Sequence, residues 1–159
     1  MRAPLQVEVL RRQGHWSPAS TAIRAWACAA LGRRAAGSEL AVRIVGAAES
    51  RRLNVRFRGR NQPTNVLSFP VATAAGAPAR ARHTAAPRPL GDLVVCSPLV
   101  RAEAQDQRKS LRAHWAHLIV HGALHLIGYD HMQPQDARRM ERREIAVLKQ
   151  LGFTNPYRS

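Results

Sequence analysis

Five of the seven histidines lie between residues 114 and 131, and their spacing restricts what this part of the chain can form. His114, His117, His121 and His125 follow one another at intervals of 3, 4 and 4 residues. At about 100° per residue, these intervals place the four imidazoles within an arc of roughly 80° on one side of a helix. We therefore predict a helix over residues 111–127 with an imidazole-lined face.

The second half of this face has the spacing of a metal site. Two histidines four residues apart in a helix can both reach one zinc ion at about 2.0–2.1 Å, as in HExxH helices. Gly128 is suited to end the helix in the left-handed conformation, so that the chain can reverse and bring His131 back. Three histidines with one open position are typical of catalytic zinc. We predict one Zn²⁺ per chain, held by His121, His125 and His131.

The two earlier histidines leave alternatives open. His114 and His117 could support the ligands through hydrogen bonds or contact phosphate, and packing or surface roles fit equally well. The set His117, His121 and His125 is poorly suited to a single ion, because ligands on three successive turns span about 12 Å along the axis. A histidine stripe without metal is the remaining interpretation of the pattern.

The charge indicates a polyanionic partner. The chain has 25 Lys and Arg against 10 Asp and Glu, a formal net charge of +15. Because Arg matches phosphate geometry and phosphate binding releases counterions, nucleic acid is the favoured partner. A compositional bias is the alternative, since only Lys109 and Lys149 are lysines. The N-terminus lacks the apolar core of a signal peptide and no apolar run could span a bilayer, so we expect a cytoplasmic protein without a membrane partner.

Hydrophobic periodicity indicates the fold class. Strands are expected at 5–10, 39–45, 66–69 and 91–96. A first helix is expected to end near Gly32, with Ser17 as its N-cap and Pro18 in its first turn. Further helices are expected over 47–59, over 98–127 with a break near residues 109–110, and over 134–151. Four strands and about five helices that do not strictly alternate favour an α+β fold, with a small mixed four-stranded sheet. We predict one domain over residues 1–159, with a mobile Ala/Pro/Arg-rich loop at 71–89.

The string HGALHLIGYDH at residues 121–131 resembles the signature of the YbeY family, bacterial metal-dependent endoribonucleases that mature ribosomal RNA. Three further blocks resemble family segments in the same order: LN…FRGRNQPTNVLSFP (53–70), LGDLVVC (90–96) and MERREIAVLKQLGFTNPY (140–157). The loop at 71–89 departs from the family pattern. The resemblance implies a zincin-like metal helix in an α+β core and single-strand-specific cleavage, in 3′ end processing of 16S ribosomal RNA and in ribosome quality control.

The resemblance also implies roles for particular residues. His121, His125 and His131 correspond to the family's metal ligands, and Arg58 corresponds to an arginine that the family needs for RNA cleavage. A guanidinium there could hold two phosphoryl oxygens while charge develops on them. The implied partners are single-stranded and ribosomal RNA, together with ribosomal proteins or a ribosome-associated GTPase.

The general base is not evident from the sequence. HExxH peptidases place a Glu after the first histidine, but Gly122 occupies that position here. Asp130 could orient a histidine or accept a proton, and it suits a simple turn equally well. Glu141 and Glu144 are expected to pair with arginines of their own helix.

Two other functions remain. A zincin-type metallopeptidase would fit the metal helix, although Gly122 and the net charge of +15 disfavour it. A non-catalytic RNA-binding ribosome assembly factor would fit the charge, but single-strand binders commonly stack bases on aromatic side chains. The chain has only three Trp, three Phe and two Tyr with which to do so.

Overall fold

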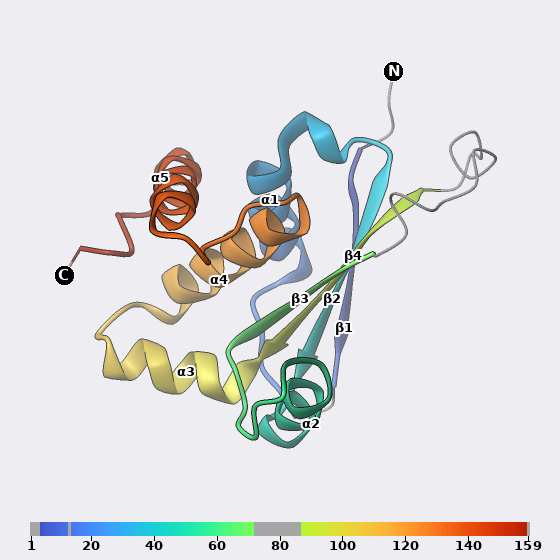
Figure 1. Ribbon diagram of the computed structural model, residues 1–159, viewed down its shortest axis with the longest axis vertical. Helices are drawn as coiled ribbons and strands as arrows, with labels where there is room; N and C mark the ends of the chain where they lie inside the picture. Colours follow the sequence, from blue (N-terminus) through green and yellow to red (C-terminus); the bar gives the residue numbers. More distant parts are fainter. Residues whose placement is uncertain (1–3, 13, 72–86, 159) are drawn as a thin grey trace.

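The computed structural model describes residues 4–12, 14–71 and 87–158. One sheet of strand order β1-β2-β4-β3 forms its centre (Figure 1). The strands β1, β2 and β4 run parallel, and β3 runs antiparallel to β4 at the edge. The elements are β1 (Gln6–Arg11), α1 (Ser20–Leu31), a 3₁₀ turn η1 (Gly32–Ala35), β2 (Ser38–Val45), α2 (Ala47–Arg58), β3 (Val66–Pro70), β4 (Arg88–Cys96), α3 (Ser97–Asp106), α4 (Leu111–Leu126) and α5 (Pro134–Gln150). The predicted α+β fold, with a mixed four-stranded sheet and five α-helices, is confirmed.

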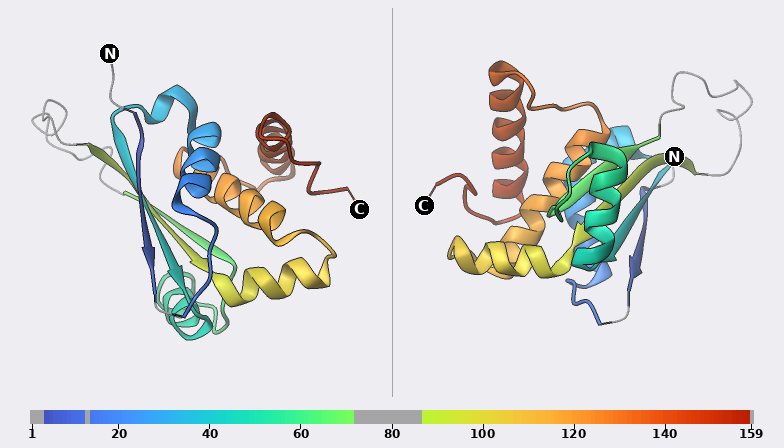
Figure 2. Two further views of the ribbon diagram at one scale, coloured as in Figure 1. Left: turned by 180° about the vertical axis from the view of Figure 1, so that it is seen from behind. Right: turned by 60° about the horizontal axis from the view of Figure 1, so that its bottom comes forward.

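The main core lies between one face of the sheet and the helices α1 and α4. Alternate side chains of the central strands, such as Ile44 of β2 and Leu93 of β4, point to this face and are fully buried. Trp115 and Ile119 of α4 pack against them with Ile23 of α1. α5 packs on the far side of α4 from the sheet (Figure 2). Burial on both sides explains why α4 is apolar around most of its circumference.

The helix α2 covers part of the opposite face. Its Leu53 packs against a small cluster of Val45, Leu67 and Val94, one from each of the strands β2, β3 and β4. The helix ends at Gly59, whose left-handed φ of 69° lets its N–H bond to the carbonyl of Val55. The predicted helix end near Gly59 is thus confirmed.

Two predicted boundaries were wrong. Ser17 does not cap α1, which begins at Ser20 after Ala19 without a side-chain cap. The Oγ atom of Ser17 instead accepts a hydrogen bond of 2.7 Å from Nε of Arg11 in β1. Strand β4 begins at Arg88 rather than residue 91, because the Arg88 N–H donates to the carbonyl of Gly37 and continues the pairing with β2.

The predicted mobile loop at 71–89 therefore loses its last residues to β4. Val71 at its other end donates its N–H to the carbonyl of Leu90. Residues 72–86 lie outside the described part of the chain, so the prediction for them stays open. Among the described residues, no helix has both the length and the apolarity needed to cross a bilayer.

Candidate metal centre

The helix α4 carries four of the histidines, and its start is set by a side-chain cap. Ser110 accepts the N–H of Ala113 at 3.0 Å, which satisfies one free donor of the first turn. The helix then runs to Leu126, one residue short of the predicted end. Gly128 follows with φ of 102°, and the N–H of Tyr129 returns to the carbonyl of Leu124. This turn reverses the chain immediately before His131.

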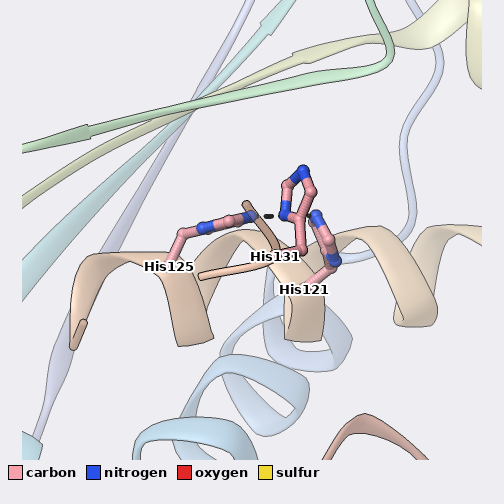
Figure 3. Close-up of side chains that lie close together, drawn as sticks. All are labelled: His121, His125 and His131. Atoms are coloured by element: carbon pink, nitrogen blue, oxygen red, sulfur yellow. Dashed lines mark hydrogen bonds between the residues drawn. The ribbon is translucent and has the colours of Figure 1, made fainter. Parts of the chain in front are cut away.

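His121, His125 and His131 converge at this end of α4 (Figure 3). One ring nitrogen from each lies within 4.8 Å of the others. The Nε2 atoms of His121 and His125 are 3.1 Å apart. The structure thus brings together the three histidines that the spacing singled out, and their role as metal ligands stays a prediction.

The protonation of His125 suits a cation. Burial, together with the neighbouring His121 and His131, lowers the pKa of His125 to about 4. His125 is therefore neutral at pH 7, the form in which imidazole binds metals. Three imidazole donors with no thiolate are the donor set of catalytic zinc rather than structural zinc. The residues present fit a zinc ion.

A buried carboxylate supports this group, and the prediction for it was wrong. Glu144 of α5 was expected to pair with arginines of its own helix, but its side chain is only 1% exposed and its partners are His117, His121 and Tyr157. Its Oε1 accepts from Nδ1 of His121 at 2.7 Å and its Oε2 from Nε2 of His117 at 2.8 Å. The hydroxyl of Tyr157 also donates to Oε2. Two donors from α4 and one from the C-terminal segment therefore meet at one carboxylate of α5.

This network holds Glu144 ionised. Burial alone would raise its pKa, but hydrogen bonds from His117, His121 and Tyr157 outweigh burial and lower the pKa to about 2. Burial and the adjacent carboxylate raise the pKa of Tyr157 above its usual range. Because an ionised Glu144 only accepts hydrogen bonds, the proton of His121 lies on Nδ1. The other ring nitrogen of His121, Nε2, faces Nε2 of His125.

The two earlier histidines have separate partners. His117 belongs to the Glu144 network and forms a second group of close donor atoms with His121 and Glu144. His114 is buried and pairs through Nε2 with Oε1 of Glu103 in α3, at 2.9 Å. Burial lowers the pKa of His114. Of the open alternatives, His117 thus supports a predicted ligand, whereas His114 joins α4 to α3.

Arg58 lies at the end of α2 and is fixed by the edge strand. Its Nη2 donates to the carbonyl of Ser68 in β3 at 3.2 Å. The hydroxyl of Ser68 in turn donates to the carbonyl of Gly122 in α4 at 3.0 Å. Gly122 directly follows His121, so a single residue of β3 connects Arg58 to α4 next to the candidate metal centre.

Asp130 lies in the reversing turn. Its Oδ1 accepts the N–H of His131 at 2.7 Å, a contact that fits the turn interpretation. The side chain is exposed and also lines a hollow of about 330 Å³ with Asp136, Arg34 and Arg139. The other carboxylate oxygen is free of protein hydrogen bonds within the described residues.

Comparison with known proteins decides the family. The model of the family described as Endoribonuclease YbeY matches residues 14–152, most of the chain. The chain belongs to the YbeY family. The matched range spans the positions of the three converging histidines, Arg58 and Glu144.

Curated YbeY proteins are similar over nearly their whole length. A protein named Endoribonuclease YbeY from Methylococcus capsulatus is 50% identical over 89% of this chain and 87% of its own length. Another of the same name from Halorhodospira halophila is 49% identical, covering 91% of this chain and 90% of its own length. Among solved structures, TM1509 from Thermotoga maritima aligns with a TM-score of 0.55 and 19% identity, over 98% of this chain and 99% of that one. This last likeness supports the fold alone.

In this YbeY chain, packing explains the glycine at the position where HExxH helices carry a Glu. Gly122 lies under β3, and a Cβ added there would meet Cδ2 of Leu93 at 2.9 Å and both Oγ of Ser68 and Cγ2 of Val66 at 3.3 Å. Close approach of the sheet and the helix therefore disfavours a larger side chain at this position. A Glu here would require the side chains of Leu93, Ser68 and Val66 to shift.

Proposed function

We propose that this chain is a zinc-dependent, single-strand-specific endoribonuclease that acts in 3′ end maturation of 16S ribosomal RNA and in ribosome quality control. Membership of the YbeY family and the names of the curated relatives support phosphodiester hydrolysis of RNA. The observation that carries the proposal is the convergence of His121, His125 and His131 within 4.8 Å in a chain of net charge +15. The proposed catalytic unit is a single domain over residues 1–159.

One zinc ion per chain would be held by these three histidines. When bound, zinc lowers the pKa of a water ligand toward 7 and polarises a phosphoryl oxygen. Glu144 supports binding by keeping the proton of His121 on Nδ1, so that Nε2 is available. His117 and Tyr157 hold the carboxylate in place from the other side.

Arg58 is proposed as the group that binds the phosphodiester. The guanidinium presents donors in a plane, which matches two phosphoryl oxygens. The hydrogen bond to the Ser68 carbonyl holds the guanidinium group beside the edge of the sheet. Ser68 also bonds through its hydroxyl to α4, the proposed metal-binding helix. Charge that develops on the phosphoryl oxygens during cleavage would therefore meet a preorganised donor.

Asp130 is proposed as a proton acceptor next to the metal. One oxygen fixes the turn that carries His131, and the second is available for a proton. Its exposure allows solvent to remove that proton afterwards. We propose single-stranded ribosomal RNA as the substrate, presented by ribosomal proteins or a ribosome-associated GTPase, in the cytoplasm.

The test measures metal content and cleavage on the same purified sample. We expect about one zinc per chain and cleavage of single-stranded RNA that a chelator abolishes and zinc restores. Duplex RNA and an unstructured peptide are the comparison substrates. Chelator-sensitive peptide cleavage without RNA cleavage would favour the metallopeptidase instead, and RNA binding without any cleavage would favour the assembly factor.

A further inference from the structure

A pair of aromatic rings lies at the surface where α2 meets the edge strand. Phe57 belongs to the last turn of α2, and its side chain is 48% exposed despite being large and apolar. Phe69 of β3 is half-buried beside it. The two ring centroids are 5.0 Å apart and the planes meet at 69°, an edge-to-face contact. Phe69 therefore packs against Phe57 on one side, and about half of Phe57 remains in solvent.

Two arginines flank the pair. The guanidinium carbon of Arg56 lies 5.2 Å from the centroid of Phe57, and that of Arg58 lies 5.9 Å from the centroid of Phe69. One acidic residue is also a neighbour of this pair in the sheet, since Asp92 of β4 lies opposite Phe69 of β3. The two guanidinium groups favour a phosphate beside Arg56 and Arg58. An exposed ring with cations around it is complementary to a base with its phosphates.

The pair is continuous with the candidate metal centre. Arg58 donates to the Ser68 carbonyl, and the hydroxyl of Ser68 reaches Gly122 next to His121. Phe69 follows Ser68 in β3, on the face of the sheet that α2 covers. At this edge of the sheet, β3 thus lies between α2 and α4 in space (Figure 2). A strand of RNA that contacts Arg58 would pass the exposed ring.

We propose that Phe57, supported by Phe69 and flanked by Arg56 and Arg58, is a base-stacking subsite for single-stranded RNA. The inference rests on the proposed endoribonuclease function and adds a substrate-binding surface to it. In a duplex, each base is already stacked on both sides, and only an unpaired base can offer a free face to Phe57. The subsite would thus contribute to single-strand preference without reading sequence, because every base has such a face.

The test measures binding of a short nuclease-resistant 2′-O-methyl RNA and of an abasic strand of equal length. Phe57→Ala should weaken RNA binding by roughly five- to a hundredfold, the range that one stacked base contributes. The abasic strand, which keeps its phosphates, should bind Phe57→Ala and the wild type equally. Phe57→Trp should bind RNA as well as wild type or better, whereas Phe57→Leu should resemble Phe57→Ala.

Val55→Ala is the matched control, because Val55 lies on the same helix and is 46% exposed. It should leave RNA binding unchanged. Wild-type affinity in Phe57→Leu, or an equal loss on the abasic strand, would overturn stacking and leave Phe57 as a general apolar contact, such as a protein-docking residue. Wild-type protein that neither binds nor cleaves single-stranded RNA would refute the proposed function itself. Normal wild-type activity with an unaffected Phe57→Ala would refute only the subsite.

Discussion

Glu144→Gln tests whether the buried carboxylate sets up the metal site. The substitution keeps the shape of the side chain and removes its charge. The three groups that donate to Glu144 would then meet an amide with a single acceptor oxygen. At least one donor must lose its partner, and the Nδ1 proton of His121 is no longer fixed by a negative charge. We expect zinc affinity to fall about 10- to 100-fold, the usual effect of losing a carboxylate behind a metal-binding histidine.

The stability of the metal-free protein gives a second measurement. Folding lowers the pKa of Glu144 from 4.5 to about 2. This difference corresponds to about 3 kcal/mol of stabilisation of the folded protein at neutral pH. Because the pKa of Glu144 is lower in the folded protein than in the unfolded chain, this stabilisation is fully present above about pH 5. It is lost as the pH falls toward 2. Glu144→Gln should therefore unfold at lower urea concentration than wild type at pH 7. The two unfolding midpoints should approach each other as the pH drops below 4.5.

Zinc affinity is measured by competition with a chromogenic chelator, and stability by urea unfolding from pH 7 downward. Glu141→Gln is the matched control, one turn earlier in α5 and outside the network, and it should behave as wild type. Tyr157→Phe should have an intermediate effect because it removes one of the three donors. Unchanged zinc affinity in a folded Glu144→Gln protein would refute the positioning role.

Four further expectations follow from the site. His131→Ala should lose its zinc by elemental analysis, whereas His114→Ala should retain it; full occupancy in the first variant would exclude the proposed ligand set. Arg58→Ala should slow single-turnover cleavage about 10²- to 10³-fold, with a smaller loss of RNA affinity and an unchanged zinc content. Arg58→Lys should recover part of the rate. Equal losses in rate and affinity would make Arg58 a general phosphate contact. RNA affinity should fall with salt at a slope of about −0.7 per phosphate contacted, and a flat titration would argue against a basic RNA surface. Gly122→Ala should lower the urea midpoint despite the better helix propensity of Ala, because crowding against Leu93 of β4 and against Val66 and Ser68 of β3 costs about 1–3 kcal/mol. A stabilised variant would contradict the packing argument.

The three converging histidines could be predicted because their arrangement is local. His121 and His125 share a helix face through their spacing alone, and Gly128 supplies the reversal for His131 within a few residues. The approximate positions of the strands and helices could also be predicted, because hydrophobic periodicity is a local property of the sequence. Ser17 was assigned wrongly as a cap because the group that engages its hydroxyl, Arg11, belongs to a strand and cannot be inferred from helix signals.

The role of Glu144 could not be predicted because its hydrogen-bond partners are distant in the sequence. Its partners lie on α4 and near the C-terminus, 23 residues before it for His121 and 13 after it for Tyr157. A clue was present, since Glu144 is four residues from both Met140 and Leu148 and therefore lies on the buried side of α5. A charged residue at such a position needs buried partners. The sequence alone does not identify them.

The contact between Gly122 and β3 has a consequence for how hydrolases of this kind can change. A peptidase-like Glu in the metal helix requires a side chain where Leu93 and Ser68 already lie within 3.3 Å of an added Cβ. A Glu introduced there by a single substitution would crowd Leu93 of β4 together with Val66 and Ser68 of β3, and these side chains would have to shift to admit it. A shift of Ser68 would disturb the residue that links Arg58 to α4. A change from phosphodiester to peptide hydrolysis by this route would thus weaken the existing arrangement while it adds the new base.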